Sequence, residues 1–290
     1  MARKILLVIN QKAGTSRKDV LYKLLQKGGK PSGSTVEIAE TQHRGHGKSI
    51  AAHASKAGYD TIIAAGGDGS VNDIVNGIDP AVSRLGVIPM GSGNGLARAL
   101  KIPLKPEAAI ERIWHGRPLL MDVGRANERL FVSNAGIGFD AHVAHAFLKT
   151  KRRGFTGYAL TSGKEIFRYQ SIELQIETED QSWTGRYFMA NVANGSQFGY
   201  NFQIAPPASV TDGILDIVLI QMKHVLQAVP VLIGAFNGTL TNQSQVTHIR
   251  SRKVTFSAKG LTHFQADGDV FDCNETVVFS VIPQYLTILV

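Results

Sequence analysis

The stretch IIAAGGDGSVN, Ile62–Asn72, decides the fold of this chain. Its first four residues form an apolar run that predicts a buried parallel strand, and the run stops at the turn Gly66–Gly69. Polar capping residues and an apolar helical face follow from Ser70, so a strand, a tight turn and a helix succeed one another. Such a turn suits phosphate, because glycines let backbone N–H groups approach the oxygens and the helix presents its positive end. A plain turn between strand and helix is the simpler interpretation of the motif alone.

The first part of the chain alternates strands and helices. The predicted strands are 4–10, 35–40, 61–65 and 85–89, and the predicted helices are 17–27, 47–57, 70–77, 96–100 and 106–115. This alternation predicts a parallel sheet covered by helices on both faces. Ligands of such sheets lie beyond the carboxyl ends of the strands, so we expect the loops 10–15, 66–69 and 90–95 to meet at one edge.

From about residue 119 the pattern changes to short strands separated by turns. The predicted strands are 122–125, 129–135, 171–178, 184–194, 214–221, 246–257, 262–266 and 275–281, with helices only around 140–168 and 223–240. This pattern predicts a mainly antiparallel β-sandwich. We therefore expect an α/β domain at 1–121, joined by a returning strand at 284–290, and a β-rich domain at 122–283.

The composition excludes several classes of protein and of binding partner. The chain has 290 residues, 43% of them apolar and 19% charged, and it holds no run of ~18 apolar residues, so we expect a soluble, cytoplasmic protein. The single cysteine, Cys273, excludes an internal disulfide and a multi-cysteine zinc site. The net charge of +8 favours anionic partners, and its densest cluster is Lys149 with Lys151–Arg153. That cluster either attaches the protein peripherally to an acidic membrane or is a solvated helix end. Nucleic acid is not expected, because no aromatic stacking series accompanies the basic residues.

A second glycine loop, GSGN at 91–94, follows the first by about twenty-five residues, and the combination is more specific than either loop alone. With both loops the chain resembles the diacylglycerol kinase catalytic-domain family, which includes bacterial soluble lipid kinases and the sphingosine and ceramide kinases. The likeness extends over essentially the whole chain. Serine stands at 70 and 92 where the family usually has threonine, and Gly95 stands where bacterial members usually have aspartate, which is closer to the sphingosine kinase branch.

The resemblance implies which residues bind ATP. They belong to a first loop at 10–14, to a threonine near the adenosine and to the two glycine loops. The set is Asn10, Gly14, Thr41, Gly66, Gly67, Asp68, Gly69, Ser70, Asn72 and Ser92. Asp68 is expected to face a metal or a bound water, since a bare carboxylate would repel phosphate.

The resemblance also implies a metal site and a catalytic base in the second domain. The segment Ala208–Asp216 is similar to the family's DGxLD region, which implies Mg²⁺ held by the Asp212 carboxylate and by main-chain carbonyls near Ser209 and Ile214. The triplet Asp267–Asp269 is similar to the family's DGE, whose second acid is the general base, so Asp269 takes that role with a side chain shorter by one methylene. Without the resemblance, both segments are simply turns between strands.

The implied activity is that of a lipid kinase, which uses ATP and Mg²⁺ to phosphorylate a hydroxyl of diacylglycerol, a sphingoid base or a related lipid. Asp68 would support the metal or its waters, and Asp269 would deprotonate the lipid hydroxyl. The expected partners are the lipid, an anionic inner membrane surface contacted peripherally, and a second copy of the chain in a homodimer. Two alternatives remain open: an NAD kinase or sugar-phosphate kinase, which also use a GGDG loop, and a catalytically silent nucleotide- or lipid-binding protein.

Overall fold

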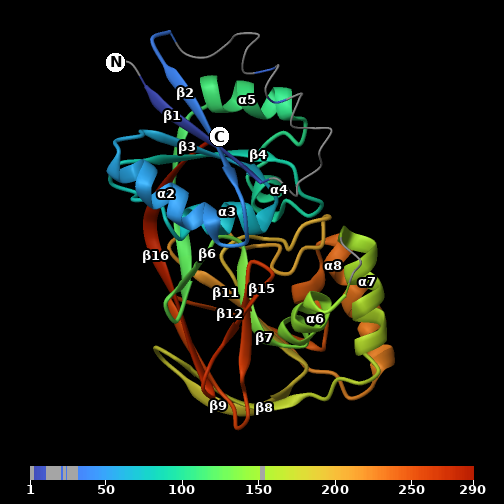
Figure 1. The fold of residues 1–290 in the computed structure, drawn as a ribbon. Helices are drawn as coiled ribbons and strands as arrows, with labels where there is room; N and C mark the ends of the chain where they lie inside the picture. Colours follow the sequence, from blue (N-terminus) through green and yellow to red (C-terminus); the bar gives the residue numbers. More distant parts are fainter. Residues whose placement is uncertain (1–2, 11–20, 22–23, 25–31, 151–153) are drawn as a thin grey trace. The chain divides into compact units, whose positions relative to one another are not determined.

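The computed structural model describes residues 3–10, 21, 24, 32–150 and 154–290. The expected loop 11–16 lies outside these residues, as do Lys151–Arg153 of the basic cluster and all of the expected helix 17–27 except Leu21 and Leu24. The chain divides into two compact units, Met1–Met121 with Gln284–Val290, and Asp122–Pro283 (Figure 1).

The first unit is a parallel sheet with helices on both faces. Its strands are β1 (Lys4–Asn10), β2 (Thr35–Thr41), β3 (Thr61–Gly66), β4 (Arg84–Pro89) and the last residues of β16 (Thr276–Leu289), in the order β2-β1-β3-β4-β16. Its helices are α2 (His46–Lys56), α3 (Asp68–Val75), α4 (Gly95–Ala99) and α5 (Pro106–His115). Figure 1 shows α2 and α3 on one face of the sheet and α5 on the other. Burial on both faces explains why β1 and β3 are almost entirely apolar.

The second unit is built on a sandwich of two antiparallel sheets. One sheet contains the first part of β16, β13 (Lys253–Ser257), β8 (Ile172–Thr178) and β9 (Ser182–Tyr187). The other has the order β12 (Val246–Ser251), β11 (Leu215–Ile220), β10 (Met189–Ala193), β7 (Asn134–Gly138), β14 (His263–Ala266) and β15 (Asp269–Asp272). A hairpin of β5 (Pro118–Ala126) and β6 (Arg129–Phe131) accompanies them. The parallel α/β unit and the antiparallel sandwich confirm the predicted fold class.

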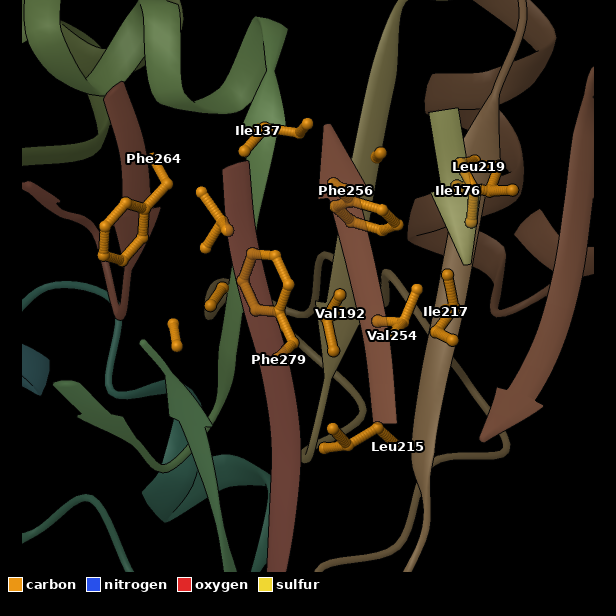
Figure 2. Close-up of a cluster of buried hydrophobic side chains, with 14 of the residues drawn as sticks. Ile137, Ile176, Val192, Leu215, Ile217, Leu219, Val254, Phe256, Phe264 and Phe279 are labelled. Carbon is orange, nitrogen blue, oxygen red and sulfur yellow. The ribbon is translucent and has the colours of Figure 1, made fainter. Parts of the chain in front are cut away.

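The main core of the second unit lies between its two sheets. Figure 2 shows Ile137, Ile217 and Phe264 of one sheet together with Phe256 and Phe279 of the other. The rings of Phe256 and Phe279 lie 5.2 Å apart, and both side chains are fully buried. Every second side chain along the facing strands therefore points into one buried layer, as expected for a sandwich.

Helices form a third layer over the outer face of the sheet that contains β10 and β11. They are α6 (Phe139–Leu148), α7 (Gly154–Glu165), the 3₁₀ turn η1 (Val225–Gln227), α8 (Ala228–Asn237) and the 3₁₀ turn η2 (Leu240–Asn242). A second apolar cluster, which includes Met189, Val218, Val231 and Ala235, fixes this layer to the sheet.

Three segments that the sequence predicts as single strands are each divided in two. The segment 129–135 breaks between β6 and β7, because the N–H groups of Val132 and Ser133 bond Asp267 instead of a neighbouring strand. The segment 184–194 breaks at Phe188, and the segment 246–257 breaks at Arg252, where the chain passes from one sheet to the other. Apolar alternation continues through these breaks, so it does not reveal them.

Candidate functional site

Residues from separate loops meet at the carboxyl ends of the first unit's strands. Asn10 and Thr41 are register partners at the ends of β1 and β2. The Asn10 amide donates to Ser70 Oγ over 2.9 Å, which joins the end of β1 to the turn after β3. A Cβ on Gly66 would lie 2.4 Å from the same Ser70 oxygen, so glycine makes room for this contact. Within the described residues, the expected convergence of loops is therefore present, and Gly14 lies outside them.

The two glycine loops contact each other through bare backbone. A Cβ on Gly91 would approach the Gly67 Cα to 2.5 Å, and a Cβ on Gly67 would approach the Gly91 Cα to 3.1 Å. The Met90 N–H also donates to the Gly66 carbonyl over 2.8 Å. Side chains at 67 and 91 would force the loops apart, so both glycines are required for this close packing.

Asp68 fastens the second loop to the first. Its Oδ2 accepts the Asn94 N–H at 2.8 Å and its Oδ1 accepts the Gly95 N–H at 2.7 Å. Desolvation of the carboxyl raises the pKa of Asp68, and hydrogen bonds from Gly95 and then Asn94 oppose that rise. We expected this carboxylate to face a metal or a water. The structure adds that both of its oxygens hold the second loop.

Asp68 reaches that loop because α3 begins earlier than the sequence pattern indicates. Gly67 is extended, with φ −92° and ψ −172°, and serves as the N-cap, so Asp68 lies in the first helical turn. The positive end of α3 therefore points toward the two loops.

Asn94 orders the second loop from within. It has φ 54°, a left-handed conformation that asparagine tolerates, and its side chain both accepts from the Gly91 N–H and donates to the Gly91 carbonyl. Asn94 is not among the residues predicted from the sequence, although its position in GSGN was the available signal.

The other expected nucleotide residues differ in their surroundings. Gly69 and Ser92 are exposed, and a Cβ on Gly69 would meet open space. Asn72 is buried on α3, where its carbonyl groups accept from the Asn76 amide at 3.0 and 3.1 Å. Asn72 therefore stabilises the helix that carries the loop.

In the second unit, Asp269 begins β15, directly after a tight turn. Asp267 and Gly268 have φ values of 49° and 84°, as a two-residue hairpin requires. The Asp267 carboxylate accepts three backbone N–H groups, from Val132 and Ser133 at 2.8 Å and from Asn134 at 3.1 Å. The turn that presents Asp269 is thus anchored to the segment between β6 and β7.

A buried polar network supports the same hairpin. The Asp140 Oδ2 accepts from the amides of Asn191 and Gln265, both at 3.1 Å, and the Gln265 Oε1 accepts from the Gly268 N–H at 3.0 Å. Burial raises the pKa of Asp140 to about 6, against the hydrogen bonds from Asn191 and Gln265 that lower it. Burial and then the Asp140 charge raise the pKa of Tyr169. Polar residues inside the apolar strands β10 and β14 were the sequence signal for this network.

The expected magnesium ligands lie on the turn before β11. The Asp212 carboxylate forms an ion pair with Arg250, and the Asp122 Oδ2 accepts the Gly213 N–H at 2.7 Å. Hard oxygen ligands suit Mg²⁺, but the only carboxylate of the expected set already neutralises a guanidinium. Among the described residues, no group of three or more His, Cys, Asp or Glu side chains is placed to hold a metal. Magnesium held by Ser209, Asp212 and Ile214 stays a prediction.

A cavity of about 670 Å³ lies between α6 and α7 in the second unit. Its lining combines apolar residues such as Ala146 and Leu160 with the basic residues His145, Lys149 and Lys164.

Comparison with known proteins identifies the family. Residues 4–126 match the model of the diacylglycerol kinase catalytic domain, and residues 133–290 match that of the YegS C-terminal NAD kinase beta sandwich-like domain. A protein of Chromohalobacter salexigens named "Probable lipid kinase YegS-like" is 28% identical over 82% of this chain and 78% of its own length. A diacylglycerol kinase of Staphylococcus saprophyticus is 27% identical over 87% of this chain and 82% of its own length.

Solved structures share the fold. The crystal structure of a diacylglycerol kinase from Bacillus anthracis has a TM-score of 0.76 at 21% identity and covers 99% of this chain and 96% of its own. An NAD kinase from Archaeoglobus fulgidus in complex with ATP has a TM-score of 0.52 at 14% identity, over 99% of this chain and 93% of its own. The fold likeness agrees with the two family matches, which together extend over most of the sequence. The chain therefore belongs to the diacylglycerol kinase catalytic-domain family.

Proposed function

We propose that this protein transfers the γ-phosphoryl group of ATP to a hydroxyl of a lipid such as diacylglycerol or a sphingoid base. The observation that carries the proposal is the pair of glycine loops held together by Asp68 at the carboxyl edge of a parallel sheet. The names of the relatives, lipid kinase and diacylglycerol kinase, support a lipid acceptor. ATP as donor is supported by the related fold of an NAD kinase that binds ATP.

In this proposal the first unit holds the nucleotide. The backbone N–H groups of the loop at 66–69 and of residues 92–93 and the positive end of α3 bind the triphosphate, and Asn10, Thr41, Ser70 and Ser92 supply polar contacts. Asp68 acts on the loops, since its oxygens fix their relative position. Mg²⁺ that accompanies ATP would neutralise phosphate charge.

The second unit supplies the acceptor side. Asp269 takes the proton from the lipid hydroxyl, and Asp267 positions it through the hairpin. The cavity between α6 and α7 is the candidate place for the lipid, because Ala146 and Leu160 offer apolar surface for an acyl chain. Attachment to an anionic membrane through the basic residues around 149 belongs to the same proposal, as does a homodimer as the assembly.

The test is an assay of acceptors. The purified chain is incubated with labelled ATP, Mg²⁺ and, in separate reactions, diacylglycerol, phosphatidylglycerol, sphingosine, ceramide and NAD. We expect label in a lipid product for the wild type, and loss of that product in Asp269→Ala. Asp272→Ala is the matched control, because this acid lies on the same hairpin with a side chain 94% exposed.

Each alternative function predicts a different labelled product, or none, in this assay. The NAD kinase alternative rests on the shared sandwich and fold, and label found only in NADP would establish it and end the lipid proposal. ATP binding without any labelled product would favour a silent binding protein.

A further inference from the structure

The segment formed by η1 and α8 exposes a row of large apolar side chains. Leu226 is 75% exposed, Val229 and Ile233 are each 55% exposed, and Leu232 and Phe236 are close to half exposed at 46% and 47%. Their spacing of three and four residues places Leu226, Val229, Ile233 and Phe236 along one face of the helix. We call these five residues the α8 face.

The opposite face of the helix already packs against the protein. Val231 and Ala235 belong to the apolar cluster over the sheet, and Ala228 and Gly234 are buried beside them. A Cβ on Gly234 would lie 3.1 Å from the Leu240 Cα, so the helix lies close to η2 and cannot turn its outer face inward. A surface helix normally presents polar residues to water. A contiguous exposed apolar face therefore indicates contact with a membrane or with another protein.

The charge near this face favours an anionic partner. The sequence from 217 to 266 contains no Asp or Glu, and the exposed residues Lys223 and His224 stand immediately before η1. Leu160 on α7 and Phe167 after it add exposed apolar surface to the helical layer. An apolar helix face with a lysine at its start and no acidic residue in its own segment suits the surface of an anionic bilayer.

A lipid surface fits this face better than a second copy of the chain. Its five exposed side chains are all apolar, whereas only a little more than half of a typical protein interface is apolar. None of the helices in the described part of the chain is long and apolar enough to cross a membrane. In contact with lipid, α8 would therefore lie along the bilayer surface.

We infer that the α8 face docks on an anionic bilayer, with its apolar side chains in the boundary between headgroups and acyl chains. The inference builds on the proposed function, because the acceptor of a lipid kinase is itself embedded in a bilayer. It places an apolar membrane contact on α8, in addition to the charged contact proposed for the basic residues around 149.

The first experiment measures binding to vesicles. Vesicles of phosphatidylcholine alone and of phosphatidylcholine with phosphatidylglycerol at 3:1 are titrated with wild type, with the double variant Ile233→Ser/Phe236→Ser and with the control Val82→Ser/Leu104→Ser. The control residues are 45% and 40% exposed and lie in the first unit. We expect the α8 variant to bind the anionic vesicles about thirtyfold more weakly and the control to bind within about twofold of wild type.

The second experiment separates docking from catalysis. With a short-chain diacylglycerol dissolved in water, the α8 variant should phosphorylate as fast as wild type, and with long-chain diacylglycerol in the anionic vesicles it should be at least about tenfold slower. Circular dichroism and thermal melting check that the variant is folded.

Three results would overturn the inference. The first is that the wild type does not bind the vesicles, and the second is that the α8 variant binds them as tightly as the wild type. The third is that the wild type is a dimer and the α8 variant a monomer, because the face would then be an interface between copies. Vesicle binding that depends on Ile233 and Phe236 supports the docking face even if no lipid is phosphorylated. Vesicle binding therefore tests the docking face, and lipid phosphorylation separately tests the proposed function.

Discussion

Replacing Asp267 tests whether the hairpin that carries Asp269 is held by one carboxylate. Asp267→Ala removes the acceptor of three backbone N–H groups at 2.8, 2.8 and 3.1 Å. A hydrogen bond to a charged group contributes about 1.5–3 kcal/mol, but water can rebind part of this half-buried turn, so we expect a loss of about 2–4 kcal/mol. Alanine at φ 49° adds about 1 kcal/mol of backbone strain.

Asp267→Asn separates the strain from the hydrogen bonds. Asparagine tolerates the left-handed backbone, and its carbonyl can replace Oδ1, which accepts from Ser133 and Asn134. Its amide would face the Val132 N–H, so one bond is lost and two donors meet. We expect this variant to lose about 1–2 kcal/mol, less than half the loss in Asp267→Ala.

Urea unfolding of the two variants and of Asp272→Ala gives the free energies of unfolding. A positioning role further requires that kcat for the lipid fall in Asp267→Asn while the KM for ATP stays unchanged. If Asp267→Ala unfolds within about 0.5 kcal/mol of Asp272→Ala, the three hydrogen bonds do not anchor the hairpin and the reasoning is wrong.

Three further substitutions test the site and the buried network. Asp269→Ala should lower kcat at least about a hundredfold and leave ATP affinity by calorimetry nearly unchanged, and a wild-type rate would remove Asp269 from the mechanism. Asp68→Asn should weaken ATP binding about tenfold, because an amide cannot accept from both Asn94 and Gly95; equal affinity would show that the loop tie is dispensable. Asp140→Asn tests a pH effect: folding raises the pKa of Asp140 from 3.8 to about 6, so this acid destabilises the folded state progressively as pH rises through that range. The free energy of unfolding of wild type relative to the variant should therefore fall by about 3 kcal/mol between pH 3.5 and 7, and a constant difference would contradict the burial argument.

The sequence predicted best what depends on neighbouring residues. The apolar run before Gly66 predicted β3, and the helix predicted at 106–115 is α5 with both its bounds, which a proline at its start suits. The alternation of strands and helices also predicted that the two glycine loops meet at one edge of the sheet. Local pattern was sufficient for β3 and α5, because each is set by residues close together in the chain.

The missed features depend on contacts between distant residues. Asp267 bonds N–H groups more than 130 positions earlier, and this tie divides β6 from β7 within a continuous apolar pattern. Asp68 was predicted to face a metal or a water, but its bonds to Asn94 and Gly95 depend on how two loops fold together. Neither spacing nor propensity encodes such pairings.

Strand β16 is shared by the two units, and this restricts how the protein can be divided. Its early residues pair with β13, as in Ser280 with Lys253, and near its end Ile288 pairs with Leu85 of β4. Val290 also exchanges backbone hydrogen bonds with Arg117. A fragment that stops at Met121 would expose the edge of β4, so expression of the first unit by itself calls for residues 284–290 to be grafted after a linker or added as a peptide.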